Sequence, residues 1–354
     1  MNLFLSILVT FICMPWPALI MMSPMMIAAP GFANKKSSIL VAMLFFIYPA
    51  FVFNLLHVSG YSFYGSNALW WAAIAVALGA LVSIVYGLPR QLINVFRGIA
   101  NYDYFIKDQN VYLNGKKIKG ADASTFTHFN NRGYYSKDAT HVYYNESKVE
   151  QADAETFQPL LNDDTKHFWH DKKNVYYAWK GLTKADGASI VYAGNGYVFD
   201  KNHVYFEDLL IEEADRNTFT VLFGHCGRDS KNVFVRTTRA TNVKVPKTFE
   251  MVFIQDEQFG KDKDQIYVLR HTPPHPLEPF PEADLETFEV VGDYYAKDKN
   301  KVYYYSYHTN QILIVELANS ATFVLYFDAT RNTDATDGKH YYKSGILHTE
   351  QKNK

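Results

Sequence analysis

Two short groups of residues in this chain have side chains that could bind a metal ion or attack a substrate. The first contains His167 and His170, which lie beside Asp163, Asp164 and Asp171. Imidazole and carboxylate groups are common metal ligands. In an extended strand, however, the two histidines would point to opposite faces, because side chains alternate. Neither histidine has a recognised ligand spacing to residues elsewhere, so we expect no metal site.

The second group is Cys226, which directly follows His225 and has the thiol of a cysteine nucleophile. The sequence indicates no third residue that would orient the histidine. It also contains no P-loop, no Gly-x-Ser-x-Gly elbow and no His-Glu-x-x-His motif. We therefore expect no catalytic residue, no cofactor and no metal, and keep a hydrolase only as the last alternative.

A recurring sequence motif, called here the first word, dominates the second part of the chain. The structure that it forms must position any catalytic or metal-binding residues. The clearest copy of the first word runs from Ala296 to Tyr305 and reads AKDKNKVYYY. If the central Val or its substitute is used as a marker, eight copies follow one another at spacings of 29 to 39 residues, which indicates a repeat array. The markers are Val111, Val142, Val175, Val204, Val233, Ile266, Val302 and Tyr341.

A second word follows each of the first seven copies and in its fullest form reads Ala-Asp-x-x-Thr-Phe, as at Ala121–Phe126. The aspartate of the first word can accept a backbone N–H two residues on and so open a tight turn. The Val-Tyr-Tyr run after it has a strong β preference. We expect a β-hairpin from the first word, and a single helical or 3₁₀ turn capped by aspartate from the second. These hairpins must stack on one another, because one alone is not stable.

Three features of the repeats resemble sites. Arg270–Pro281 is a proline-rich insertion that we expect to leave the sheet, because proline cannot donate to a strand ladder. It is either a plain surface loop or an extended segment that docks a partner. Repeated aspartates such as Asp298 suggest calcium loops, but lysines rather than further carboxylates flank them, so turns are the better interpretation. Gly194-Asn195-Gly196 is likewise explained by a turn.

Residues 1–100 have a different composition, with four Lys or Arg and no acidic residue. Three apolar runs, Leu3–Ala29, Ile39–Leu56 and Ala68–Leu88, are each long enough to span a bilayer, which takes about 20 residues. The prolines of the first run predict a kink or break near Pro15–Pro17. A cleaved signal peptide is the alternative for this run, although no basic residue precedes it.

The charges of the chain predict its orientation and exclude one class of partner. If all three runs span, Lys35, Lys36, Arg90 and Arg97 lie on one side, and the positive-inside rule places the repeats in the cytoplasm. The periplasm is the alternative. Residues 101–354 carry 31 Lys or Arg and 36 Asp or Glu, so we expect no nucleic-acid partner.

The repeats resemble the DKNYY family, which is named for the word seen here as Asp298-Lys299-Asn300-Lys301-Val302-Tyr303-Tyr304. The resemblance covers about residues 104–343. It implies a bacterial repeat protein of a kind that is commonly membrane-attached or exported, and it transfers no activity, cofactor or site residue. The unit around Val233 departs from the pattern, because Val245-Pro246 replaces its Ala-Asp pair.

These observations predict a transmembrane region at residues 1–92, a linker at 93–101 and a repeat domain at 102–354. The repeat domain is expected to be all-β, with stacked hairpins and short helical turns in an open, solenoid-like array. A closed, propeller-like ring is the alternative, which the unequal repeat lengths disfavour. We expect a membrane-anchored, non-catalytic module that binds a protein or a cell-envelope component such as a glycan through exposed aromatic residues. A scaffold subunit of a membrane complex is the alternative function.

Overall fold

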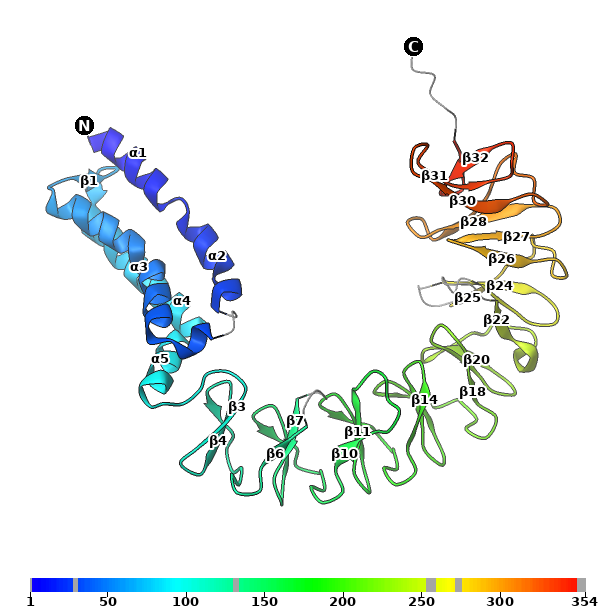
Figure 1. The fold of residues 1–354 in the computed structure, drawn as a ribbon, viewed down its shortest axis with the longest axis horizontal. Coiled ribbons are helices and arrows are strands. Elements are labelled where there is room, and N and C mark those ends of the chain that lie inside the picture. The colour runs from blue at the N-terminus through cyan, green and yellow to red at the C-terminus, as the bar shows by residue number, and fades with distance from the viewer. Residues whose placement is uncertain (1, 28–30, 130–133, 253–258, 271–275, 349–354) are drawn as a thin grey trace, which may run out of the picture. The chain divides into compact units, whose positions relative to one another are not determined.

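A computed structural model of the protein describes residues 2–27, 31–129, 134–252, 259–270 and 276–348. Its internal contacts divide the chain into two units, Met1–Glu155 and Thr156–Lys354. The first unit contains all the α-helices and two of the repeat sheets, and the second contains six further sheets (Figure 1). Each unit is described by itself.

The helices of the first unit include three segments that are long and apolar enough to cross a membrane, Leu3–Met21, Lys36–Val58 and Ala68–Val85. A turn at Met14 and Pro15 breaks the first segment in two, as its prolines predict. The helices are α1 (Asn2–Cys13), α2 (Trp16–Ile27), the 3₁₀ helix η1 (Phe32–Asn34), α3 (Lys36–Val58), α4 (Ala68–Val85) and α5 (Leu88–Phe96).

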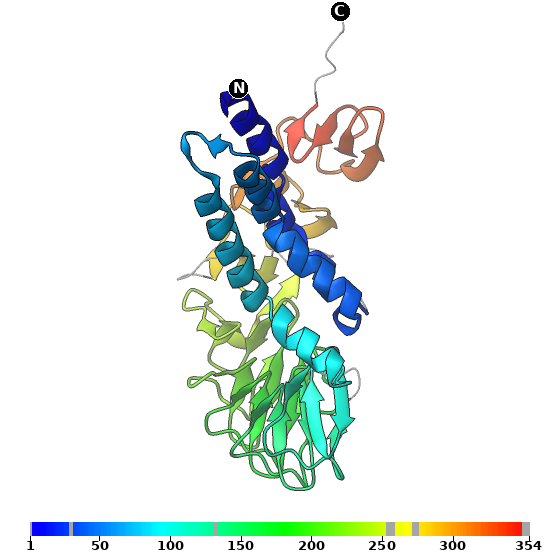
Figure 2. The same ribbon diagram turned by 90° about the vertical axis from the view of Figure 1, so that its left-hand side faces the viewer.

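Helices α3 and α4 lie side by side, and both views of the ribbon show this pairing (Figures 1 and 2). A small hairpin, β1 (Ser62–Phe63) and β2 (Ser66–Asn67), connects them. Gly79 permits their close approach, because a Cβ atom there would collide with the carbonyl oxygen of Phe46 and the side chain of Ile47. The small residue therefore sets the distance between the two helices.

A group of three asparagines, of which Asn94 and Asn101 are buried, joins the helices to the first repeat sheet. The Asn94 side chain in α5 donates to Oδ1 of Asn101 and to the carbonyl oxygen of Gly115, at 2.8 Å each. The backbone N–H of Asn101 donates to Oδ1 of Asn34, beside α3, at 2.8 Å. Residues 93–101, expected to be a linker, thus contain the end of α5 and the centre of this junction.

The first unit ends in two antiparallel sheets, the second of which has four strands. Their strands are β3 (Tyr104–Lys107), β4 (Asn110–Leu113) and β5 (Lys116–Lys117), then β6 (Thr127–His128), β7 (Tyr135–Lys137), β8 (Val142–Tyr144) and β9 (Ser147–Lys148).

The second unit contains six four-stranded antiparallel sheets, in each of which the strands are hydrogen-bonded in chain order. The strands are β10 (Gln158–Pro159), β11 (Phe168–His170), β12 (Val175–Tyr177) and β13 (Lys180–Gly181); β14 (Val191–Gly194), β15 (Tyr197–Phe199), β16 (Val204–Phe206) and β17 (Leu209–Leu210); β18 (Thr220–Val221), β19 (Cys226–Arg228), β20 (Val233–Val235) and β21 (Thr238–Arg239); β22 (Glu250–Val252), β23 (Phe259–Lys261), β24 (Ile266–Leu269) and β25 (Leu277–Pro279); β26 (Glu289–Gly292), β27 (Tyr295–Lys297), β28 (Val302–Ser306) and β29 (Gln311–Ile314); and β30 (Val324–Asp328), β31 (Thr333–Thr336), β32 (Tyr341–Lys343) and β33 (Ile346–Leu347).

The eight copies of the first word each form one open sheet, and no sheet closes on itself in the described part of the chain. The expected hairpin is present in every copy as the central strand pair, for example β27 and β28. Short strands on either side extend most hairpins to four strands. The second word forms a single turn, closed at Asp122–Thr125 by a backbone hydrogen bond of 3.3 Å, and η2 (Pro246–Thr248) lengthens it to a 3₁₀ helix.

The core of the second unit lies between successive sheets. Phe288, from a second word, lies 5.1 Å from the ring of Phe259 in the sheet before it and 6.3 Å from the ring of Tyr303 in the sheet after it. Both faces of an inner sheet are therefore buried, and each repeat depends on its neighbours for stability.

The proline-rich insertion does not leave the sheet as expected. Leu277–Pro279 forms strand β25, in which Pro279 lies opposite Tyr267. Because β25 is an edge strand, proline costs it no hydrogen bond on its outer side. Residues 271–275 of the insertion lie outside the described residues.

Candidate functional site

Each four-stranded sheet has two rims with different contents. In an antiparallel sheet hydrogen-bonded in chain order, the first and third turns lie at one end of the strands and the second turn lies at the other. We call the end with the second turn, which contains the aspartate of the first word, the clasp rim. The end with the first and third turns is the turn rim.

The clasp rim is built on a buried carboxylate, shown most completely by Asp262. Its Oδ1 accepts the backbone N–H groups of Asp264 and Gln265 at 2.8 and 2.9 Å, which closes the turn. Its Oδ2 accepts the hydroxyl of Tyr267 at 2.7 Å and the N–H of Val245 at 2.9 Å. Because Val245 belongs to the connection from the preceding sheet, this carboxylate fastens two repeats together.

The same clasp recurs along the chain, as the repeated words predict. The bond from the second word to the carboxylate measures 2.9 to 3.0 Å at Asp138, Asp200, Asp229, Asp298 and Asp337, from the N–H groups of Asp122, Asp186, Asp215, Asp284 and Asn319. A second-word hydroxyl adds another bond, since Thr287 Oγ1 accepts the N–H of Lys299 at 3.1 Å. These contacts show that the aspartates close turns, as expected from the sequence.

The turn rim of the second unit differs from sheet to sheet and exposes large apolar side chains. It is laterally connected, because His225 Nδ1 lies 3.2 Å from the carbonyl oxygen of Asn195 in the preceding sheet. The exposed side chains on or next to its turns are Leu161, Trp179, Phe223, Tyr307 and Phe327, with exposed fractions of 74%, 69%, 41%, 65% and 77%. A rim of this kind offers contact area to a partner.

A hollow of about 320 Å³ lies on the turn rim among three successive sheets. The Tyr192 hydroxyl donates to Asp164 across two sheets, and the Asn195 side chain donates to the carbonyl oxygen of Leu222 at 3.0 Å. The lining residues are Asp164, Thr165, Tyr177, Tyr192, Asn195, Gly196, Glu207 and His225.

The tyrosines of this hollow stay protonated at neutral pH. Burial and the hydrogen bond to Asp164 raise the pKa of Tyr192 to about 12. Burial, followed by the charges of Glu207 and Asp208, raises the pKa of Tyr177. The hollow therefore presents phenol hydroxyls, carboxylates and an imidazole that can hydrogen-bond a polar ligand.

The histidine group considered from sequence does not converge. The His167 ring packs 5.5 Å from the ring of Tyr177, whereas His170 Nδ1 lies 2.9 Å from the carbonyl oxygen of Gly187. Asp163 is used locally, since its Oδ2 accepts the N–H of Phe168 at 2.8 Å. Among the described residues, no three His, Cys, Asp or Glu side chains gather in a way that could hold a metal ion.

The two residues of the second candidate site, Cys226 and His225, also lie apart. Cys226 is fully buried, with an exposed fraction of 0%, and packs in a core with Val233 and Tyr267. His225 lies on the turn rim instead, with a positive φ of 57°. The thiol is therefore out of reach of a substrate on the surface. Asn195 and Gly196 form a turn as expected, directly after Gly194 ends β14, and Asn195 adopts a positive φ of 51° within it.

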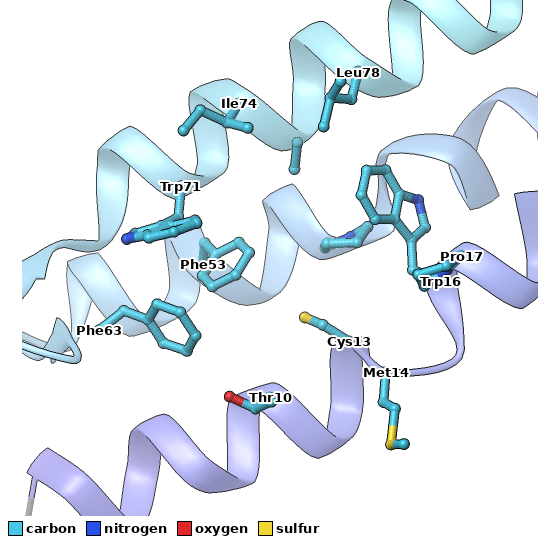
Figure 3. A pocket seen from close by; sticks show the side chains of 12 residues that line it. Thr10, Cys13, Met14, Trp16, Pro17, Phe53, Phe63, Trp71, Ile74 and Leu78 are labelled. Carbon is cyan, nitrogen blue, oxygen red and sulfur yellow. The ribbon is translucent and has the colours of Figure 1, made fainter.

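A second hollow, of about 430 Å³, lies among the helices of the first unit (Figure 3). It lies where α1 and α2 diverge at Pro15, a break that the sequence indicates although the cavity itself was not predicted. Its lining residues are Thr10, Cys13, Met14, Trp16, Pro17, Pro49, Phe53, Phe63, Trp71, Ile74, Ala75 and Leu78. The surface is apolar almost throughout.

The comparisons with known proteins agree with the geometry of the repeats. The family model described as the DKNYY family matches residues 104–167, 135–196 and 168–345. No curated protein and no solved structure matches the chain. The matched residues run from β3 to β32, with the clasps, and leave out the α-helices. With two thirds of its length matched, this chain belongs to the DKNYY family.

Proposed function

We propose that this protein is a membrane-anchored repeat module whose turn rim binds a partner protein or a component of the cell envelope, and that it does so without catalysis. The helices serve as an integral, multi-pass anchor in a bacterial inner membrane, and the repeats lie in the cytoplasm. The contrast between the two rims is the observation that carries this proposal.

The clasp rim repeats one structural solution from sheet to sheet, which is what stacking requires. The turn rim has no such constraint on its residues, and there the chain places exposed residues such as Trp179 and Phe223. Large aromatic side chains dominate the binding energy of protein interfaces when they are buried by a partner. Leaving them in water costs solubility, so a partner that covers them accounts for their presence.

Capture experiments with the full, detergent-solubilised protein test the proposal. A rim variant carries Leu161→Ala, Trp179→Ala and Phe223→Ala together. A matched control variant carries Val191→Ala and Ile314→Ala, which are 50% and 53% exposed but lie at the clasp-rim ends of their strands.

We expect the capture of a specific partner by the rim variant to fall at least about 10-fold, because one hot-spot aromatic residue among the three contributes roughly 2 kcal/mol. The control variant should retain the partner. Equal loss in both variants, or capture that depends only on the helices, would contradict the proposal and favour the scaffold function. Loss of binding to an envelope glycan rather than to a protein would identify the partner class.

A further inference from the structure

We propose that the apolar pocket of the first unit holds one hydrocarbon chain of a membrane lipid. The proposal rests on the membrane insertion of the helices, which belongs to the proposed function above. The walls of the pocket come from two sides. Cys13 and Trp16, at the break between α1 and α2, face Phe53 of α3 and Trp71 and Ile74 of α4 (Figure 3).

The hydroxyl and the two indole N–H groups in the pocket wall already have partners within the protein. Thr10 Oγ1 donates to the carbonyl oxygen of Ser6 at 2.9 Å. The indole of Trp16 donates to the carbonyl oxygen of Phe46 at 2.9 Å, and the indole of Trp71 donates to Ser66 Oγ at 2.6 Å. A polar ligand would lose its own hydrogen bonds without gaining replacements, so the pocket selects an apolar occupant.

The pocket opens to the surroundings of the helices rather than being sealed. Met14, Ile74 and Leu78 in its wall are 71%, 46% and 44% exposed. Since the walls are helices long and apolar enough to cross a membrane, those surroundings are hydrocarbon in an inserted protein. An acyl chain can therefore enter sideways without crossing a polar barrier.

The size of the pocket distinguishes a lipid chain from a helix of another protein. From Trp71 to Leu78 its wall covers about 10 Å of α4, at about 1.5 Å per residue, within the ~15 Å depth of one leaflet. A helix about 10 Å across would need roughly 800 Å³ over that length. The pocket offers about 430 Å³, which suits one extended chain parallel to α4.

Retention of lipid through purification tests the inference. The full protein is reconstituted in vesicles of phosphatidylcholine and phosphatidylglycerol, extracted in detergent, and its bound lipid is counted by mass spectrometry of the intact protein. We expect about one retained lipid per chain, and at least a fivefold loss in Ile74→Trp and, separately, in Leu78→Trp, because the added ring fills the pocket. Val76→Trp is the matched control, since Val76 is 47% exposed on α4 outside the pocket.

Equal retention in Ile74→Trp, Leu78→Trp and Val76→Trp would overturn the inference, and so would efficient cross-linking of two chains through Cys13, which would place a second copy at the pocket. Failure of insertion is recognised separately by Trp70, which is 72% exposed and does not line the pocket. In a variant whose other four tryptophans are phenylalanine, phosphatidylcholine with brominated chains quenches Trp70 only if α4 lies in the bilayer. If Trp70 is quenched but Ile74→Trp and Leu78→Trp retain as much lipid as the unaltered protein, the proposed function stands and the pocket is rejected as a lipid site.

Discussion

At the scale of single residues, the clasp aspartates are buried although their side chains are acidic. Asp171, Asp200 and Asp298 have exposed fractions of 0%, 1% and 3%. A buried carboxylate is tolerated only where hydrogen bonds replace the water it has lost. The clasps at Asp200 and Asp298 supply these bonds from the turn itself, from a tyrosine five residues on and from the preceding connection. At Asp229 the tyrosine is replaced by Phe234, and the turn and the preceding connection supply the bonds.

Two aspartates in one turn provide a matched test of the clasp. Asp262→Ala removes the acceptor for four donors, and we expect it to destabilise its sheet by roughly 2 kcal/mol or more, because buried donors are left unpaired. Hydrogen exchange of the amides in β22–β25 should then accelerate about 30-fold. Asp264→Ala is the control, since the Asp264 side chain is 44% exposed and its backbone N–H is kept. Similar exchange in the two variants would show that the carboxylate is not the fastening group.

The charge of Asp138 predicts a dependence of stability on pH. Burial alone would raise its pKa, but hydrogen bonds from Asp122, Thr140, Tyr143 and His141 outweigh burial and lower the pKa to about 2. Since this lies below the ordinary value of 3.8, the ionised carboxylate stabilises the fold above about pH 4. About 2 kcal/mol of that stabilisation should be lost as the pH falls from about 4 to about 2.

Titration of the Asp138 carboxyl carbon by NMR measures this directly, and a midpoint near the ordinary value would refute it. Asp138→Asn, whose side chain does not titrate in this range, should remove this contribution to acid unfolding.

At the scale of elements, the sheet β30–β33 differs from the sheet before it at one position of its outer face. In the sheet before it, Tyr304 lies six residues after the turn aspartate and packs between the two sheets. The corresponding residue of the last sheet is Lys343, whose ammonium lies 3.8 Å from Asp334 and 6.0 Å from the centre of the Phe327 ring. Tyr342 faces inward, so its neighbour Lys343 faces outward. The outer face also exposes apolar side chains such as Tyr326, Phe327 and Ile346. The charge of Lys343 is therefore what disfavours the stacking of a further sheet there.

Lys343→Tyr should remove the charge from this face and let it accept another neighbour. We expect this variant to self-associate, because it places a tyrosine where the preceding sheet uses Tyr304 for stacking. Lys339→Tyr adds the same ring at an exposed turn position on the clasp rim and should leave the protein in its original state. Sedimentation velocity of the detergent-solubilised proteins distinguishes the two. An unchanged sedimentation coefficient for Lys343→Tyr would show that the outer face does not limit the array.

The central hairpins were predictable from sequence because turn chemistry and β preference coincide there. The outer strands were not, since pairs such as Gln158–Pro159 and Lys180–Gly181 are too short to show a period. Pro279 was wrongly expected outside the sheet, because the sequence does not show which strand will lie at an edge.

The turn rim was only partly foreseeable. Exposed aromatic residues were expected, but Trp169 and Trp179 look equally apolar in the sequence, and only the fold shows that one is 1% exposed and the other 69%. The sequence did contain one signal of a variable rim, namely the variation in repeat length. The longest insertion lies between β24 and β25, at a turn of the turn rim. The helix pocket had no signal beyond the prolines, since a cavity depends on the packing of segments distant in sequence.

At the scale of the molecule, the geometry of the first unit brings the basic residues of its helical region to one end. Lys36, at the start of α3, places its ammonium 4.3 Å from the centre of the Phe96 ring, at the end of α5. Asn34 and Asn101 are hydrogen-bonded at the same end. If α3 and α4 form a transmembrane pair, Lys35, Lys36, Arg90 and Arg97 therefore lie on a single side of the membrane with the beginning of the repeats.

The positive-inside rule predicts that this side is the cytoplasm. A fluorescent protein that matures only in the cytoplasm should be bright when fused after Lys354, and alkaline phosphatase at the same position should be inactive. The same reporters inserted after Gly65, in the hairpin between α3 and α4, should give the opposite pattern. Replacing the four basic residues with glutamine should produce both orientations, because the asymmetry that fixes the pair is then lost. Phosphatase activity from the Lys354 fusion of the unaltered protein would place the repeats, and the partner that their turn rim binds, in the periplasm.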